Sequence, residues 1–163
     1  MKASQTMPLL LLCSLCTLFL SACAGRVIGP DELESVVESI WVLERIEGKH
    51  PLRPQEPNAE PITLELSGDG RAVGFAGANR FFGQVEITPE GEIRFGPLGT
   101  TRRYLDEPTG LMDQENRLLE ILSEVDTYRV HDERLILFRD GRKMLIYRAS
   151  PPPAQPDRKT TPG

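Results

Sequence analysis

Few side chains in this 163-residue chain have the types and spacing that chemistry requires. The two histidines, His50 and His131, are not in a metal-ligand pattern, and zinc would need typically three or four His, Cys or carboxylate ligands together. The Gly-x-Ser-x-Gly sequence of a nucleophilic serine is absent. We therefore expect no catalytic residue, no metal site, no cofactor and no enzyme activity. The alternative is a hydrolase, which would need His131 beside a nucleophile in a cleft.

All three cysteines lie within the first 23 residues. Lys2 and the apolar run from Met7 to Leu20 are typical of a cleaved signal peptide, and the run is shorter than the ~20 residues that span a bilayer. The segment Leu20-Ser21-Ala22-Cys23 resembles a bacterial lipobox, in which the cysteine thiol receives a diacylglycerol and the chain is cut before it. We expect residues 1–22 to be a lipoprotein signal peptide and Cys23 to be the lipidation site. The alternative is an ordinary secretory signal with a free Cys23.

The net charge of the chain and the residue that follows Cys23 indicate the partners and the location of such a protein. With 19 Lys and Arg against 24 Asp and Glu, the formal charge is −5, which argues against nucleic acid or an anionic bilayer surface as a partner. Ala24 follows Cys23, whereas resemblance to enterobacterial lipoproteins associates an Asp at this position with the inner membrane. We expect a protein of the cell envelope, anchored to the membrane by lipid, at the outer membrane facing the periplasm. Several acyl chains would make this anchor permanent.

The rest of the chain divides into three parts. Residues 23–39 are predicted to be a lipidated N-terminus and tether, in which the acidic stretch 31–38 could form a short helix. Residues 150–163 are rich in Pro and lack apolar side chains beyond Ala154, so we expect a disordered tail. Residues 40–149 are predicted to form the folded domain, long enough for one core without disulfides.

Within residues 40–149, short runs that alternate apolar and polar side chains predict antiparallel strands. The expected strands are 41–46, 62–66, 71–75, 81–87, 92–95, 98–103, 128–131, 134–138 and 144–148. Apolar residues at spacings of three and four from Leu111 to Val125 predict one amphipathic helix. We expect an α+β fold, a curled antiparallel β-sheet or incomplete barrel packed around that helix.

Three stretches carry a resemblance to a known family: Gly74 to Gly83, Phe95 to Arg102, and Met112 to Glu115. They are similar to the META-domain family, whose members include the HslJ heat-shock lipoprotein, and the resemblance covers about residues 41–148. It implies a small antiparallel β-structure around a helix, an envelope location and a role in stress or antibiotic tolerance, with no established catalytic activity. Many members have cysteines where this chain has Ala78 and Leu105, so a redox or metal role resting on them does not transfer.

Asn79, Arg80 and Arg102 of this motif are the expected binding surface. Asn79 is suited to a left-handed turn. Arg80 and Arg102, with Arg103, could converge into an anion-binding patch, because guanidinium groups match carboxylate or phosphate. The interpretation that we favour for these arginines is a set of structural ion pairs with acids further along the chain, the candidates being Asp106, Asp113 or Glu115.

Neighbouring phenylalanines on a strand must face opposite sides, so we expect one of Phe81 and Phe82 to be exposed as a contact surface. The leading hypothesis is a non-enzymatic, lipid-anchored envelope protein that binds another envelope protein, a misfolded client or a small apolar molecule. The alternative is a pilotin-like carrier of an apolar ligand or lipid in the curled sheet, which predicts a cavity lined by Leu118 and Leu122.

Overall fold

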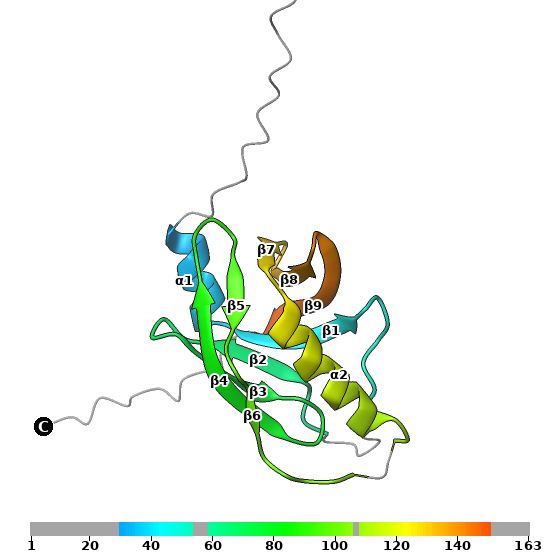
Figure 1. The fold of residues 1–163 in the computed structure, drawn as a ribbon. Coiled ribbons are helices and arrows are strands. Elements are labelled where there is room, and N and C mark those ends of the chain that lie inside the picture. Colours follow the sequence, from blue (N-terminus) through cyan, green and yellow to red (C-terminus); the bar gives the residue numbers. More distant parts are fainter. Residues whose placement is uncertain (1–29, 54–58, 106–107, 151–163) are drawn as a thin grey trace, which may run out of the picture.

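The computed structural model describes residues 30–53, 59–105 and 108–150 (Figure 1). The predicted signal peptide, the lipidation site Cys23 and the tail beyond Ser150 lie outside the described residues. The elements follow in chain order: α1 (Pro30–Glu38), β1 (Ile40–Ile46), β2 (Thr63–Leu66), β3 (Arg71–Phe75), β4 (Arg80–Ile87), β5 (Ile93–Phe95), β6 (Gly99–Thr100), α2 (Leu111–Glu124), β7 (Thr127–His131), β8 (Arg134–Arg139) and β9 (Arg142–Ser150). Within the described residues, neither helix has the length and apolar character to cross a membrane.

The strands form one antiparallel sheet in the order β5-β4-β3-β2-β1-β9-β8-β7, with β6 paired to β4. Most partners are consecutive in the chain, as expected for hairpins joined by short turns. The exceptions are β6, which pairs with β4 although β5 lies between them in the chain, and the central pair, in which β1 lies against β9 and joins the start and the end of the sheet's strands.

The two edges of this sheet meet at one end. Glu92, next to β5, forms an antiparallel bridge with Thr127 in β7. The Ile93 N–H donates to the Asp126 carbonyl at 3.0 Å, and the Tyr128 N–H donates to the Gly91 carbonyl at 2.8 Å. The sheet is therefore curled almost into a barrel, which confirms the predicted fold class.

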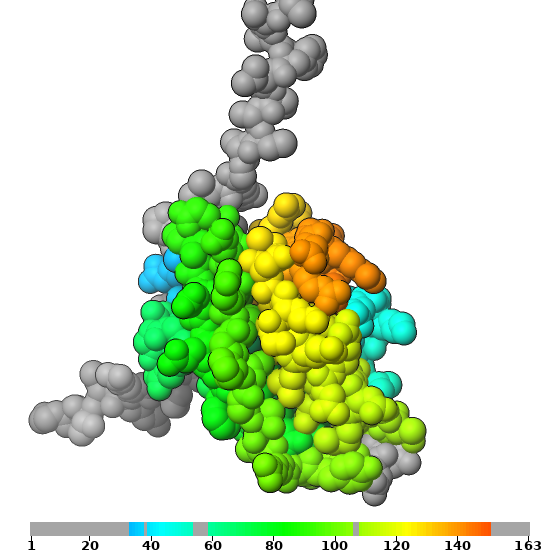
Figure 2. All heavy atoms as spheres, viewed as in Figure 1, coloured from blue at the N-terminus to red at the C-terminus, as the bar shows by residue number. Residues whose placement is uncertain are grey.

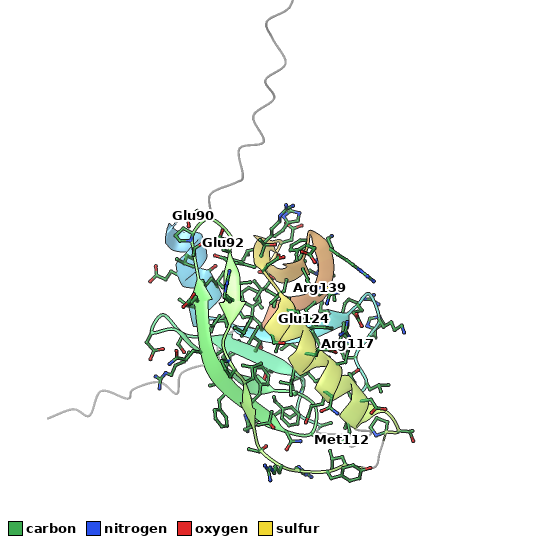
Figure 3. All side chains as sticks on the ribbon, viewed as in Figure 1. Glu90, Glu92, Met112, Arg117, Glu124 and Arg139 are labelled. Carbon is green, nitrogen blue, oxygen red and sulfur yellow. The ribbon has the colours of Figure 1, made fainter. Side chains whose placement is uncertain are left out.

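Helix α2 covers the side of the sheet where the two edges part. On the face drawn in Figure 2, its residues lie between those of β4 and β5 and those of β8 and β9. The apolar stripe predicted from the sequence is buried: Leu111, Leu118, Ile121 and Leu122. On the solvent side, Glu124 forms an ion pair with Arg139 of β8, and the two are labelled side by side in Figure 3.

Helix α1 also belongs to the folded unit. Val36 is fully buried in the core, and the Trp41 indole N–H donates to the Val36 carbonyl at 2.9 Å. The folded unit therefore starts before residue 40, the boundary that sequence analysis expected. This nine-residue helix is too short for a clear periodic pattern, although its described apolar side chains, Leu33, Val36 and Val37, are buried or half-buried.

The interior of the curled sheet is filled by side chains. Leu118 and Leu122 of α2 are fully buried and belong to the same apolar cluster as Trp41, Tyr128 and Tyr147 from the sheet. These two leucines therefore pack against the sheet, where the carrier hypothesis predicted that they would line a ligand cavity.

The strand expected at 98–103 is reduced to Gly99–Thr100. Arg103, which lies beyond β6, exchanges both of its backbone hydrogen bonds with the side chain of Asn79: its N–H donates to Oδ1 at 2.6 Å, and its carbonyl accepts from Nδ2 at 2.8 Å. An amide side chain thus replaces a strand partner here, which alternation of apolar residues does not reveal.

Candidate functional site

The centre of the sequence motif is a buried carboxylate. Glu115 of α2 is 3% exposed, yet both of its oxygens are satisfied. Oε2 accepts from the N–H groups of Ala78 (3.0 Å) and Asn79 (2.8 Å), and Oε1 accepts from Asn79 Nδ2 at 2.7 Å. Such charge-assisted hydrogen bonds offset the desolvation of a buried carboxylate.

The turn between β3 and β4 has the conformation that makes this possible. Gly77 has a φ of 126°, which L side chains rarely adopt, and a Cβ there would lie 3.1 Å from Leu111 Cδ1. The Ala76 N–H closes the turn on the Asn79 carbonyl at 2.8 Å, and the N–H groups of Ala78 and Asn79 point inward. Consecutive backbone amides of this kind form an anion-binding concavity. Here the anion is the protein's own Glu115.

The prediction that Asn79 belongs to a binding surface is wrong. Asn79 is 3% exposed, and it is not among the residues with positive φ, so the expected left-handed turn is also wrong. Its side chain joins α2, the turn and the segment after β6, since Oδ1 also accepts from Thr101 Oγ1 at 3.0 Å. The role is structural, and its partner Glu115 is too distant in the chain for spacing to indicate it.

Arg80 and Arg102 are both exposed, as a binding surface requires, but they do not form the predicted patch with Asn79. Arg80 Nη2 lies 2.8 Å and 3.0 Å from the two carboxylate oxygens of Glu60, and its guanidinium lies 5.9 Å from the centre of the Phe75 ring. This is the structural ion pair favoured from the sequence, with a different acid. Arg102 makes no ion pair with another described residue.

Phe82 provides the exposed aromatic side chain that the alternation predicts. Phe81 is 1% exposed and faces the core, whereas Phe82 is 54% exposed. Across the strands, Phe82 is in register with Val73, which is 39% exposed. Phe75 and Arg80 lie on the same side of β3 and β4, and we call these four residues the Phe82 face.

A second feature is a hollow of about 640 Å³ on the outer side of β1, β9 and β8. Two isoleucines, Ile136 and Ile146, lie opposite each other there and alternate with buried leucines of the same strands. Around them are five Lys or Arg side chains, both histidines and one acid: Arg45, Arg53, Arg134, Lys143, Arg148, His50, His131 and Glu44.

The sequence pattern did not predict this hollow, because its lining residues are spread over more than one hundred positions. One signal in the sequence could have indicated it: several outward-facing positions of neighbouring strands are basic. Arg134 lies in register with Arg148, and Arg45 lies in register with Ile146 of the apolar floor. The hollow brings both histidines together, but its lining includes no Ser, Thr or Cys, so the nucleophile of the hydrolase hypothesis is missing there. In the described part of the chain, no group of three His, Cys, Asp or Glu could hold a metal ion.

Comparison with known proteins agrees with this architecture. The sequence model of the META domain matches residues 34–151, more than two thirds of the chain. The chain belongs to the META-domain family. The match begins inside α1, so this META domain includes part of the helix that sequence analysis assigned to the tether.

Two solved structures resemble this META domain. A protein from Burkholderia xenovorans, determined by NMR, is 28% identical with a TM-score of 0.57, over 79% of this chain and 93% of that chain. A second NMR structure is 22% identical with a TM-score of 0.55, over 71% of this chain and 92% of that chain, and shows the fold alone. No curated protein matches the chain.

Proposed function

We propose that this META domain is a non-enzymatic, lipid-anchored protein of the cell envelope that holds another envelope protein at the Phe82 face and supports tolerance of envelope stress and antibiotics. The observation that carries the proposal is Phe82 itself, an aromatic ring 54% exposed on β4, where the strand is paired with both β3 and β6. Aromatic and arginine side chains are the residues most enriched in protein interfaces.

The ring of Phe82 is held in place before any partner arrives. Phe82 is in register with Gly99 of β6, and a Cβ on Gly99 would come within 2.8 Å of the ring. The ring therefore lies over the glycine, and little side-chain entropy would be lost on binding. Val73 extends the apolar surface on one side, and Arg80 gives it a charged edge.

The proposed anchor fits the position of the folded unit. The lipobox-like Leu20-Ser21-Ala22-Cys23 precedes α1 closely, and the seven residue steps from Cys23 to Pro30 span at most about 25 Å when extended. A lipidated Cys23 would therefore keep the domain near the membrane. Labelling with palmitate tests this step: Cys23→Ser should abolish label and membrane retention, and unchanged labelling would refute the anchor.

The docking proposal is tested in cells with the lipidated full chain. A photo-cross-linking amino acid replaces Phe82, and a matched variant carries it at Glu90, which is exposed in the turn between β4 and β5 (Figure 3). We expect an adduct with one envelope protein from position 82, lost when Val73→Ser is added, and no such adduct from position 90. Equal adducts from both positions would refute the docking surface.

Stress tolerance follows as a linked outcome. A strain that carries Phe82→Ser should lose growth under envelope stress or antibiotic to the same degree as a strain that carries Cys23→Ser. The Phe82→Ser protein would lose the contact with its partner, and the Cys23→Ser protein would lose its attachment to the membrane. Normal growth of the Phe82→Ser strain, at an equal level of the protein, would show that the Phe82 face has no role in stress tolerance.

A further inference from the structure

We propose that the hollow on the outer side of β1, β9 and β8 is a binding site for a phosphate group carried on an apolar molecule. The site is separate from the Phe82 face and does not depend on it. Its floor is formed by Ile136 and Ile146, and its rim is almost entirely basic.

A β-bulge in β1 explains how one strand contributes two consecutive residues. The register between β1 and β9 shifts between Leu43 and Arg45, and both Glu44 and Arg45 line the hollow. Such a bulge places an extra residue opposite one partner, so two neighbours can face the same side. Arg45 then lies in register with Ile146, at the edge of the apolar floor.

Glu44 orients two of the arginines. Arg134 Nε donates to Glu44 Oε2 at 2.8 Å, and Arg148 Nη2 forms an ion pair with Oε1. The hydrogen bond from Arg134 holds the pKa of Glu44 below its ordinary value. Because a guanidinium has five N–H donors, each arginine keeps further donors for a ligand.

Three of the basic side chains have no acidic partner in the described residues, whereas His131 Nε2 lies 3.2 Å from Asp132 Oδ2. Arg45, Arg53 and Lys143 make no ion pair there, although the whole chain has a formal charge of −5. The hollow thus gathers five Lys or Arg and two His around one acid, against the charge of the protein as a whole. Concentrated charge of this kind attracts an anion, and guanidinium forks match phosphate oxygens.

Size and polarity favour a phosphate with an apolar part over a bare ion. The hollow of about 640 Å³ lies within the usual range of small-molecule sites. A free phosphate would leave Ile136 and Ile146 in contact with water, whereas an acyl or similar apolar group would cover them.

The test uses the mature chain from residue 23 with Cys23→Ser, which contains the whole described fold. Three probes are titrated by calorimetry and by amide NMR shifts: dihexanoyl phosphatidic acid below its micelle concentration, inorganic pyrophosphate, and neutral dihexanoyl phosphatidylcholine. We expect phosphatidic acid to bind most tightly, with shifts in β1, β8 and β9, and binding to weaken as salt is raised.

Two variants and one control separate the site from general charge. Arg45→Gln and Lys143→Gln should each weaken phosphatidic acid binding about tenfold, because each removes one charged donor. Arg71→Gln removes an equal charge from β3, where Arg71 forms an ion pair with Asp69, and should leave binding unchanged. Ile136→Thr should weaken binding of phosphatidic acid but not of pyrophosphate.

Each outcome decides the proposal. Tighter binding of phosphatidic acid than of pyrophosphate at the hollow supports a phosphate carried on an apolar group, whereas equal binding of the two would show a site for phosphate alone and would overturn the apolar part of the proposal. Binding of phosphatidylcholine as tight as that of phosphatidic acid, equal losses in Arg71→Gln and Arg45→Gln, or no shift with any probe at millimolar concentration would overturn the whole proposal.

Discussion

Replacing Glu115 by alanine tests whether the hydrogen bonds between this side chain and the turn after β3 stabilise the fold. The change leaves three buried N–H groups without an acceptor: the backbone N–H of Ala78, the backbone N–H of Asn79, and one of the two N–H groups of Asn79 Nδ2, whose other N–H still donates to the Arg103 carbonyl. Each unsatisfied donor costs about 1–3 kcal/mol. Because water can enter the space left by the side chain, we expect a total loss of about 3–5 kcal/mol in the free energy of unfolding. A domain of this size has about 5–15 kcal/mol in all.

Denaturant unfolding followed by tryptophan fluorescence measures this loss, since Trp41 is the only tryptophan and is buried. Glu115→Gln keeps the volume but turns one acceptor into a donor that faces other donors, so it should lose about 1–3 kcal/mol. The control Glu120→Gln, on the exposed side of α2, should change stability by less than about 1 kcal/mol. A Glu115→Gln protein as stable as the wild type would refute the argument even if Glu115→Ala failed to fold.

Three further predictions concern the elements around this tie. Phe82→Ser should leave stability almost unchanged, whereas Phe81→Ala should cost about 3–5 kcal/mol, and equal losses in denaturant unfolding would contradict the assigned faces. Gly77→Ala should cost about 1–3 kcal/mol, read from the same unfolding midpoints, because φ of 126° strains any side chain. The hydrogen bond from Arg117 lowers the pKa of Glu47 from 4.5, so this pair stabilises the fold above about pH 4.5 and its contribution is lost as pH falls through the lowered pKa. Glu47→Gln should therefore be less stable than wild type at neutral pH, with a difference that disappears in acid; a constant difference would contradict the linkage.

Sequence patterns predicted most of the sheet because its strands are hairpins with alternating side chains. Nine expected strands are present, and the helix beginning at Leu111 ends within one residue of the prediction. The segment at 98–103 was the weakest, because Asn79 takes over the backbone groups of Arg103 through its side chain. Such a substitution of side chain for strand has no periodic signature.

The candidate site was harder to predict, and for two different physical reasons. Asn79 was predicted to belong to a surface turn beside Arg80, but its side chain is buried because its acceptor, Glu115, lies on a helix 36 residues away. The basic hollow was missed because the formal net charge of −5 describes the whole chain and does not show where charges gather. The basic side chains come together only when β1, β8 and β9 pair in the folded sheet.

The residues by which the chain resembles its family are therefore mainly architectural. Gly77, Asn79 and Glu115 tie the turn after β3 to α2 and are buried from any partner, so family membership predicts the fold rather than a contact. What the chain can bind must depend on outward residues of the same strands. The Phe82 face and the basic hollow are two such surfaces, and they arise from opposite halves of one sheet.

These two surfaces should act independently. Phe82 lies on β4 and Arg45 on β1, three strands apart, which is about 14 Å along a curled sheet whose outward directions diverge. Substitutions at such a separation, with no shared partner, normally have additive effects. Arg45→Gln should weaken phosphatidic acid binding about tenfold while leaving the cross-link from position 82 intact, and Phe82→Ser should lose the envelope partner while leaving phosphatidic acid binding unchanged. Loss of both activities in either single variant, with unfolding unchanged, would mean that the two surfaces bind one ligand or partner together.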